Sequence, residues 1–197
     1  MALRSIERLS HEIAKLPGIG EKTAFRLAMH LFYAADADRG SFADALMKLK
    51  DGISLCTRCG NVATSTLCDI CSNEKRTAST ICVTAKYADL IAIENTQEYR
   101  GVYHLLHGLI SPIKGVSIND IRLKELFARI ENERPSELIL AFDAGIEGDT
   151  TANYIVKMAA GKVPVTRLAY GISMGSDIEN ADVHSLARSL TNRTSVG

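Results

Sequence analysis

The stretch Cys56-Thr-Arg-Cys59, followed after eight residues by Cys68-Asp-Ile-Cys71, decides how the middle of this chain folds. Each C-x2-C pair can place two thiolates on one ion, and four thiolates close a tetrahedral structural zinc site. Such a site has no open position for a substrate, so the zinc would stabilise the fold and not catalyse a reaction. The alternatives are two disulfides or four thiols without a role. Disulfides fit poorly, because nothing in the sequence marks a secreted chain.

The chain has 197 residues, of which 46% are hydrophobic, and its formal net charge is zero. This length allows one large domain or two small ones. A neutral chain has no global field that attracts nucleic acid or anionic lipid, so any such contact must come from a local patch. There is no apolar signal core at the start and no run long enough to span a bilayer, which makes the cytoplasm the expected location, without a membrane partner.

Two helices joined by a glycine turn are predicted before the cysteines. The first has an apolar face and ends at Pro17, and the second places Ala24 and Ala28 on one face. The turn between them is Leu16-Pro17-Gly18-Ile19-Gly20, typical of a helix-hairpin-helix. The amides of Gly18, Ile19 and Gly20 are expected to point outward at the start of the second helix, where the helix dipole favours a phosphate.

Two basic residues, Lys22 and Arg26, lie four apart on the second helix and share a face beside the turn. They could hold adjacent phosphates of a DNA duplex without reading its bases. The alternative is a helical bundle with a solvated basic edge. A third helix is predicted to start at Ser41, with Asp44 completing a cap, and to serve in packing.

Strands and helices alternate after residue 79, which predicts a parallel sheet with helices on both faces. The expected strands are 81–84, 102–106, 138–142 and 163–169, and the expected helices are 87–94, 117–130 and 150–160. Cys82 falls within the first strand and should be a buried, inert thiol. A glycine-containing loop at 171–177 does not match a nucleotide fingerprint, and 178–190 should be largely helical.

Three carboxylates, Asp143, Glu147 and Asp149, follow the strand at 138–142 and could gather Mg²⁺. Alternatively, Asp149 caps the next helix and Glu147 sits at its positive end. A two-metal centre would want another acid after the first strand, where the chain instead has Ala85-Lys86. No phosphate-binding GxxxxGK[ST] motif is present, so neither metal catalysis nor nucleotide hydrolysis is expected.

Taken together, these motifs resemble the bacterial recombination protein family RecR. The matching stretches are LPGIGEKTAFRLA (16–28), CTRCGN and CDIC (56–61 and 68–71), EYRGVYHLLHGLISPIKGV (98–116), IEGDTTA (146–152) and VTRLAYGISMGSDIENAD (165–182). They extend over nearly the whole chain. The chain departs from the family at Ala85-Lys86, where an acid is usual, and at Asp143, where an Asp is unusual. Gly145 replaces the second Asp of a catalytic DxD motif.

The resemblance implies a multi-module α+β and α/β fold with four parts. These are a helix-hairpin-helix module (1–54), a four-cysteine zinc finger (55–76), a Toprim domain with a parallel sheet core (77–172) and a C-terminal helical extension (173–197). It implies no enzyme activity. It implies homo-oligomeric rings or clamps, described as tetramers, which surround double-stranded DNA and act with RecO and RecF to load RecA on gapped DNA.

By the same resemblance, Lys22 and Arg26 match DNA-binding positions, and Glu147 with Asp143 matches the surface associated with RecO. Two other functions remain open at this point. One is a Toprim-type, Mg²⁺-dependent nuclease or primase-like enzyme, for which the carboxylates after residue 142 are the motivation. The other is an interaction module that is held together by zinc and does not touch DNA.

Overall fold

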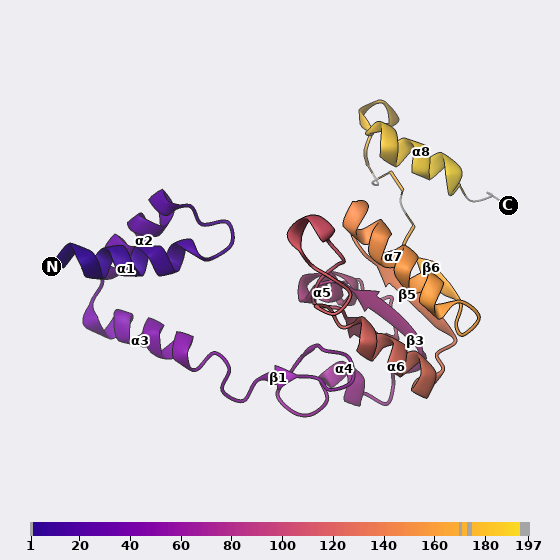
Figure 1. Ribbon diagram of the computed structural model, residues 1–197, viewed down its shortest axis with the longest axis horizontal. Helices are drawn as coiled ribbons and strands as arrows, with labels where there is room; N and C mark the ends of the chain where they lie inside the picture. Colours follow the sequence, from indigo (N-terminus) through magenta and orange to yellow (C-terminus); the bar gives the residue numbers. More distant parts are fainter. Residues whose placement is uncertain (1, 170, 173–174, 194–197) are drawn as a thin grey trace. The chain divides into compact units, whose positions relative to one another are not determined.

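The computed structural model describes residues 2–169, 171–172 and 175–193 (Figure 1). The chain divides into two compact units, the first ending at Gly52 and the second beginning at Ile53. Each unit has its own set of elements and is described by itself. Among the described residues, no helix is both long and apolar enough to cross a membrane.

The first unit contains helices α1 (Ala2–Ala14), α2 (Glu21–Tyr33) and α3 (Asp36–Met47). Helices α1 and α2 pack against each other, and Ala24 and Ala28 of α2 are fully buried. Their small side chains let the two backbones approach closely. Gly18 adopts a positive φ of 81° in the turn, a conformation that favours glycine. The predicted helical hairpin is therefore confirmed.

Helix α3 differs from the prediction at its start and in its environment. It begins at Asp36, five residues before Ser41, because acidic residues occupy its first turn and Arg39 binds both Asp36 and the carbonyl of Ala34. The predicted cap at Ser41 is wrong, since Ser41 lies within the helix. None of the residues of α3 is buried, so the packing role expected for it is not fulfilled within this unit.

The cysteine segment opens the second unit. Strands β1 (Ser54–Leu55) and β2 (Val62–Ala63) form a small antiparallel hairpin, and a single helical turn, α4 (Asp69–Ser72), follows. We call residues 54–72 the zinc knuckle. The four cysteines are buried in it, with Ala63 beside them.

A four-stranded parallel sheet forms the core of the second unit. Its strands are β3 (Thr77–Thr84), β4 (Gly101–Leu105), β5 (Glu137–Ala141) and β6 (Val165–Arg167), in the order β4-β3-β5-β6. The register pairs Ile81 with both Val102 and Leu138. The parallel sheet predicted from the alternation of strands and helices is confirmed.

Helices cover both faces of this sheet (Figure 1). Helices α6 (Leu123–Glu133) and α7 (Ile146–Ala159) pack on one face, where Leu126, Ile130 and Ile155 meet the apolar side chains of β3 and β5. Helix α5 (Tyr87–Asn95) packs on the other face through Leu90, next to Cys82.

The helices α6 and α7 begin elsewhere than predicted. Helix α6 starts at Leu123, because Asp120 accepts hydrogen bonds from the amide and hydroxyl of Ser117 and closes a separate turn. Helix α7 starts at Ile146, after Gly145, so Asp149 lies in its first turn and is not its cap. The alternative interpretation of Asp149 as a capping residue is wrong. Glu147 does lie at the positive end of α7, as the same interpretation expected.

The C-terminal segment is helical in two pieces. A short 3-10 turn, η2 (Ile178–Asn180), precedes helix α8 (Val183–Thr191), so the single helix expected over 178–190 is interrupted. Asp182 causes the break because it caps a new helix. Its carboxylate accepts hydrogen bonds from the amides of His184 and Ser185 at 3.1 and 2.9 Å. The loop at 171–177 lies partly outside the described residues. Another 3-10 turn, η1 (Pro112–Lys114), follows β4.

Candidate zinc site and nucleic-acid-binding hairpin

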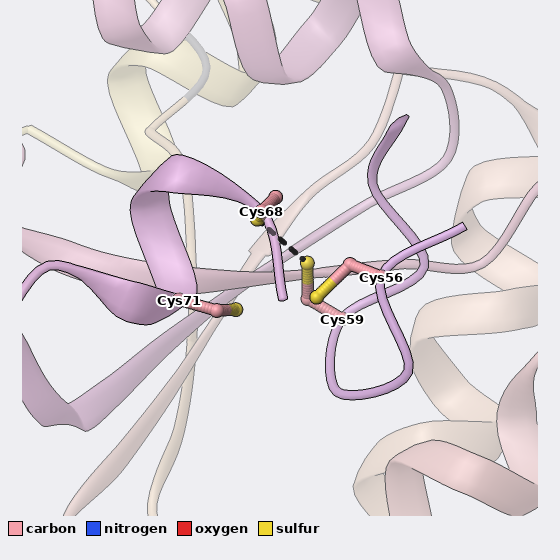
Figure 2. Close-up of side chains that lie close together, drawn as sticks. All are labelled: Cys56, Cys59, Cys68 and Cys71. Carbon is pink, nitrogen blue, oxygen red and sulfur yellow. Dashed lines mark hydrogen bonds between the residues drawn. The ribbon is translucent and has the colours of Figure 1, made fainter. Parts of the chain in front are cut away.

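The sulfur atoms of Cys56, Cys59, Cys68 and Cys71 converge in the zinc knuckle (Figure 2). All four lie within 4.8 Å of one another, and the Sγ atoms of Cys59 and Cys68 are 3.6 Å apart. Tetrahedral zinc with bonds of about 2.3 Å needs sulfurs about 3.8 Å apart. None of the four is in a disulfide. The arrangement therefore fits one zinc ion with four cysteine ligands and excludes the disulfide alternative.

The backbone around the first cysteine pair forms a tight loop. Gly60 donates its amide to the carbonyl of Cys56 at 2.9 Å and adopts a positive φ of 78°. Cys56 in turn donates its amide to the carbonyl of Asn61 at 2.7 Å, and the amide of Asn61 lies 3.4 Å from the sulfur of Cys59. The glycine is required here, because a residue with a side chain rarely adopts this φ.

The thiols of the knuckle differ in acidity before any metal binds. Burial alone would raise the pKa of Cys56, but hydrogen bonds from the backbone of Cys68, Cys59 and Arg58 lower it to about 6. For Cys59 the hydrogen bond with Cys71 and burial raise the pKa, and burial also raises that of Cys68. Zinc must therefore displace protons when it binds. Its positive charge then offsets the cost of burying the thiolates. The zinc finger predicted from the spacing is a structural site.

The glycine turn of the first unit has two amides without an acceptor among the described residues, those of Gly18 and Gly20. The amide of Ile19 instead donates to the carbonyl of Leu16 at 3.2 Å. The prediction that all three amides point outward is therefore wrong for Ile19, because the tight turn uses that amide internally. Ile19 is half-buried. A contact of Ile19 with DNA stays a prediction, but it would have to use the side chain or the neighbouring backbone and not this amide.

Lys22 and Arg26 are both exposed on α2, one helical turn apart. Neither side chain has an ion pair or hydrogen bond to any residue that the structure describes. They border a shallow cleft of about 400 Å³ with Phe25 and Met29. Two cations that no carboxylate neutralises, beside a helix N-terminus, can accept two phosphates of a nucleic-acid backbone.

The carboxylates after β5 each face a cation. Asp143 lies 3.6 Å from the Nζ of Lys86, and Glu147 lies 3.0 Å from the Nζ of Lys114. The hydroxyl of Ser111 donates to Glu147 at 2.5 Å. This hydrogen bond and that of Lys114 lower the pKa of Glu147, so the carboxylate is charged at neutral pH.

Asp149 has a different environment from the other two carboxylates. It accepts hydrogen bonds from Arg167 at 2.5 Å and from Arg188 of α8 at 2.9 Å, and these lower its pKa. Over the described parts of the chain, only the cysteines bring three or more metal-ligand side chains together. The three carboxylates therefore do not form the Mg²⁺ cluster that one interpretation of the sequence considered.

A cleft of about 450 Å³ lies at the carboxyl ends of β3 and β5, where the strand order reverses. Asp143, Glu147 and Lys86 line it, together with two exposed isoleucines, Ile113 and Ile146, that no local pattern singles out. Ile113 is 95% exposed and Ile146 is 82% exposed. Local pattern gave no signal for them, since isoleucines in an α/β segment are expected in the core.

Hairpin, zinc site and sheet together define a class of protein, a zinc-stabilised chain that joins a helix-hairpin-helix to an α/β domain. Family models match all of its parts in order: RecR helix-hairpin-helix at 6–50, the RecR zinc finger with four cysteine ligands at 53–73, Toprim domain at 79–169 and RecR C-terminal at 171–194.

Curated relatives support the same assignment. Recombination protein RecR of Brachyspira hyodysenteriae is 48% identical over 194 residues, covering 97% of this chain and 96% of the relative. The proteins of the same name from Synechococcus elongatus and Thermobifida fusca are each 43% identical over 190 residues, covering 96% of both chains. The chain belongs to the RecR family of recombination proteins.

Proposed function

We propose that this chain is a non-enzymatic, DNA-binding recombination mediator. It assembles into a ring or clamp around double-stranded DNA and acts with RecO and RecF to load RecA on gapped DNA. The observation that carries the proposal is the exposed basic pair Lys22 and Arg26 beside the glycine turn. The name shared by the relatives, recombination protein, supports a role in recombination and repair.

DNA binding of this kind reads the backbone and not the bases. The amides of Gly18 and Gly20 and the side chains of Lys22 and Arg26 are all donors suited to phosphate oxygens. None of them is placed to distinguish one base from another. Binding should therefore be independent of sequence and should weaken as salt rises.

The apolar surface of the first unit supports assembly with further copies of the chain. A unit of this size cannot bury a large core, and α3 has no buried residue. Large exposed apolar side chains extend over its three helices and the turn between the first two: Leu3, Leu16, Phe25, Phe32, Tyr33, Phe42, Leu46 and Met47. A second copy is the partner that would cover them. The tetramer and the four module boundaries given above stay predictions.

The cleft beside Asp143 and Glu147 is the proposed surface for RecO. Ile113 and Ile146 offer an apolar centre there, and the two carboxylates with their lysines form a charged rim. This is the usual composition of an interface, in which apolar anchors contribute most of the affinity and the rim contributes specificity.

Three observations support a role without catalysis. Ala85 and Lys86 stand where a metal-dependent enzyme would need an acid, and Gly145 replaces the second Asp of a DxD motif. The carboxylates that remain are paired with cations. Purified protein should therefore neither cleave nor extend DNA when Mg²⁺ is added. Turnover that Asp143→Asn abolishes would favour the nuclease or primase-like alternative.

The experiment that tests DNA binding is the double variant Lys22→Ala with Arg26→Ala. Salt dependence is measured as the slope of log K against log salt concentration. Losing two phosphate contacts should make this slope shallower by about 1.8 per bound subunit. Duplex affinity is measured by fluorescence anisotropy over a salt series. The matched control is Lys15→Ala with Lys48→Ala, which removes the same charge from the same unit. Those lysines are already paired with Glu12 and Asp44, at 2.7 and 2.8 Å.

The result is interpretable only if the assembly is intact, so the oligomeric mass of each variant is measured in solution as well. Full duplex affinity and an unchanged salt slope in the Lys22/Arg26 variant, with the native mass, would show that the proposed contact is wrong. Equal losses in the test and control variants would show that general charge, and not this hairpin, attracts the DNA.

A further inference from the structure

Strand β4 is an edge strand that is not exposed. It is the first strand in the order β4-β3-β5-β6, so one side of its backbone has no neighbouring strand. Yet all five residues of β4 are buried. Unpaired backbone groups on a sheet edge readily pair with another chain, and folded proteins usually cover such an edge.

The zinc knuckle supplies a partner for this free edge. The amide of Leu105 donates to the carbonyl of Cys59 at 2.8 Å, so a residue placed to bind zinc also satisfies one edge amide of β4. The carbonyl of Tyr103 accepts from Arg129 of α6 at 2.6 Å. Just past the strand, the Nε2 atom of His107 lies 2.8 Å from the carbonyl of Gly60.

A partly buried ion-pair network ties the knuckle to α6. Arg58, between the first two cysteines, donates from Nε and Nη2 to the two carboxylate oxygens of Glu133, both at 2.9 Å. Arg129, whose side chain is only 4% exposed, donates to the same carboxylate at 3.0 Å. Glu133 therefore joins the loop that carries Cys56 and Cys59 to the arginine that holds Tyr103.

The fit between knuckle and sheet is close at Gly60. A Cβ atom built on this glycine would lie 2.8 Å from Nε of Arg122 and 3.1 Å from Nε2 of His107. The knuckle can approach the end of β4 this closely only because the position has no side chain. The contact is thus specified by shape as well as by hydrogen bonds.

We propose that the zinc knuckle is the cover of the free edge of the sheet, and that Glu133 is a positioning residue that couples zinc binding to the order of β4. Zinc would order the loop from which Cys59 reaches β4 and Arg58 reaches α6. Binding is reciprocal, so a sheet that holds this loop in place must also favour zinc. The proposal is independent of DNA binding and of the assembly state.

Glu133→Gln tests the coupling from the side of the sheet. The variant keeps the size of the side chain but weakens the hold on Arg58, and we expect zinc affinity to fall about 10-fold, as for other residues that orient metal ligands. Affinity is measured by competition with a chromogenic chelator. The matched control is Glu131→Gln on the same helix, whose exposed ion pair with Lys162 involves no residue of the knuckle; it should bind zinc like the unchanged protein.

Arg58→Ala tests the coupling from the side of the knuckle. It leaves Glu133 paired with Arg129, so the helix keeps its internal ion pair. In the zinc-loaded variant we expect faster hydrogen exchange at the amide of Leu105. The amide of Leu138, which donates to Pro164 at 2.9 Å near the other edge, should exchange as before.

Reciprocity requires both effects. Zinc affinity in Glu133→Gln equal to that of the control would overturn the proposal, and so would unchanged exchange of Leu105 in Arg58→Ala. The double variant adds a third measurement. If the two residues act through their contact, it should lose no more zinc affinity than the more affected single variant, whereas additive losses would show that they act separately.

Discussion

Replacing Ile146 by alanine should weaken binding of the proposed partner RecO without changing the fold. Ile146 is the first residue of α7 and is 82% exposed, so its side chain contributes little to the core of the second unit. An isoleucine exposed to this extent beside a cleft is the kind of apolar anchor that interfaces bury. The alanine variant removes the anchor and leaves every charge of the rim in place.

The size of the effect follows from the carbons removed. Ile→Ala deletes three carbons, each worth about 0.8 kcal/mol when buried, and most of that surface is open to a partner. The loss is therefore about 2 kcal/mol, which raises Kd about 30-fold. Ile113→Ala should act similarly, because Ile113 is 95% exposed. Glu147→Gln should do less, since Glu147 lies in an exposed ion pair with Lys114 and such pairs contribute little.

Isothermal titration calorimetry with purified RecO measures these affinities. The control is Val156→Ala, which shortens another exposed apolar side chain on the same helix, away from the residues that line the cleft. It should bind as tightly as the unchanged protein. All four variants should melt within a degree or so of it, because exposed substitutions seldom alter stability.

The reasoning would be refuted if Ile146→Ala and Ile113→Ala bound RecO normally while Glu147→Gln abolished binding. The cleft would then act through charge alone, as an acidic patch. If none of these variants changed the affinity, RecO would bind elsewhere on the chain, and the assignment of Asp143 and Glu147 to this partner would be wrong as well.

Three further predictions concern stability. Gly101→Ala would place a Cβ atom against the hydroxyl of Tyr99 and should cost about 1–3 kcal/mol, seen as a lower melting temperature. Leu126→Ala opens a cavity in the fully buried core and should cost about 2–5 kcal/mol in denaturant unfolding. Burial alone would raise the pKa of Glu94, but its hydrogen bonds, chiefly from Arg76, lower the pKa below 4.5. Glu94 therefore stabilises the fold above pH 4.5, this contribution is lost as the pH falls through the lowered pKa, and Glu94→Gln should flatten that part of the pH–stability curve.

Local patterns in the sequence predict the parts of this chain whose physics is local. Two C-x2-C pairs can meet on one ion with little freedom, and their sulfurs do lie within reach of one zinc. Glycine at positions 18 and 60 is typical of tight turns, and Gly18 and Gly60 both adopt positive φ. The apolar run at 138–142 predicts a central parallel strand, and β5 lies between β3 and β6.

Local patterns in the sequence do not predict features that depend on contacts formed only in the folded chain, such as where a helix begins. The start of α3 depends on Arg39 binding Asp36, and the start of α7 depends on the short turn that leads from the end of β5 to Gly145. Both lie several residues before the positions that capping preferences favour. The ion pair of Arg58 with Glu133 joins residues 75 apart, and nothing in either neighbourhood predicts it. Exposure of Ile146 is likewise a property of the folded chain and not of its periodicity.

The stretch at 98–116 is one of those that carry the family resemblance, and its two parts have different roles. Residues 108–114 line the cleft at the end of β5, whereas the residues before them form β4 and its contacts. The hydroxyl of Tyr99 donates to the carbonyls of Thr80 and Val102, both at 3.0 Å, where a side chain on Gly101 would not fit. Leu105 binds Cys59, and His107 binds Gly60. The first part of this stretch, up to His107, therefore holds β4 and the zinc knuckle together. The proposed partner contacts lie in the same unit as this framework, in the cleft at the end of β5, whereas the proposed DNA contacts belong to the hairpin of the first unit.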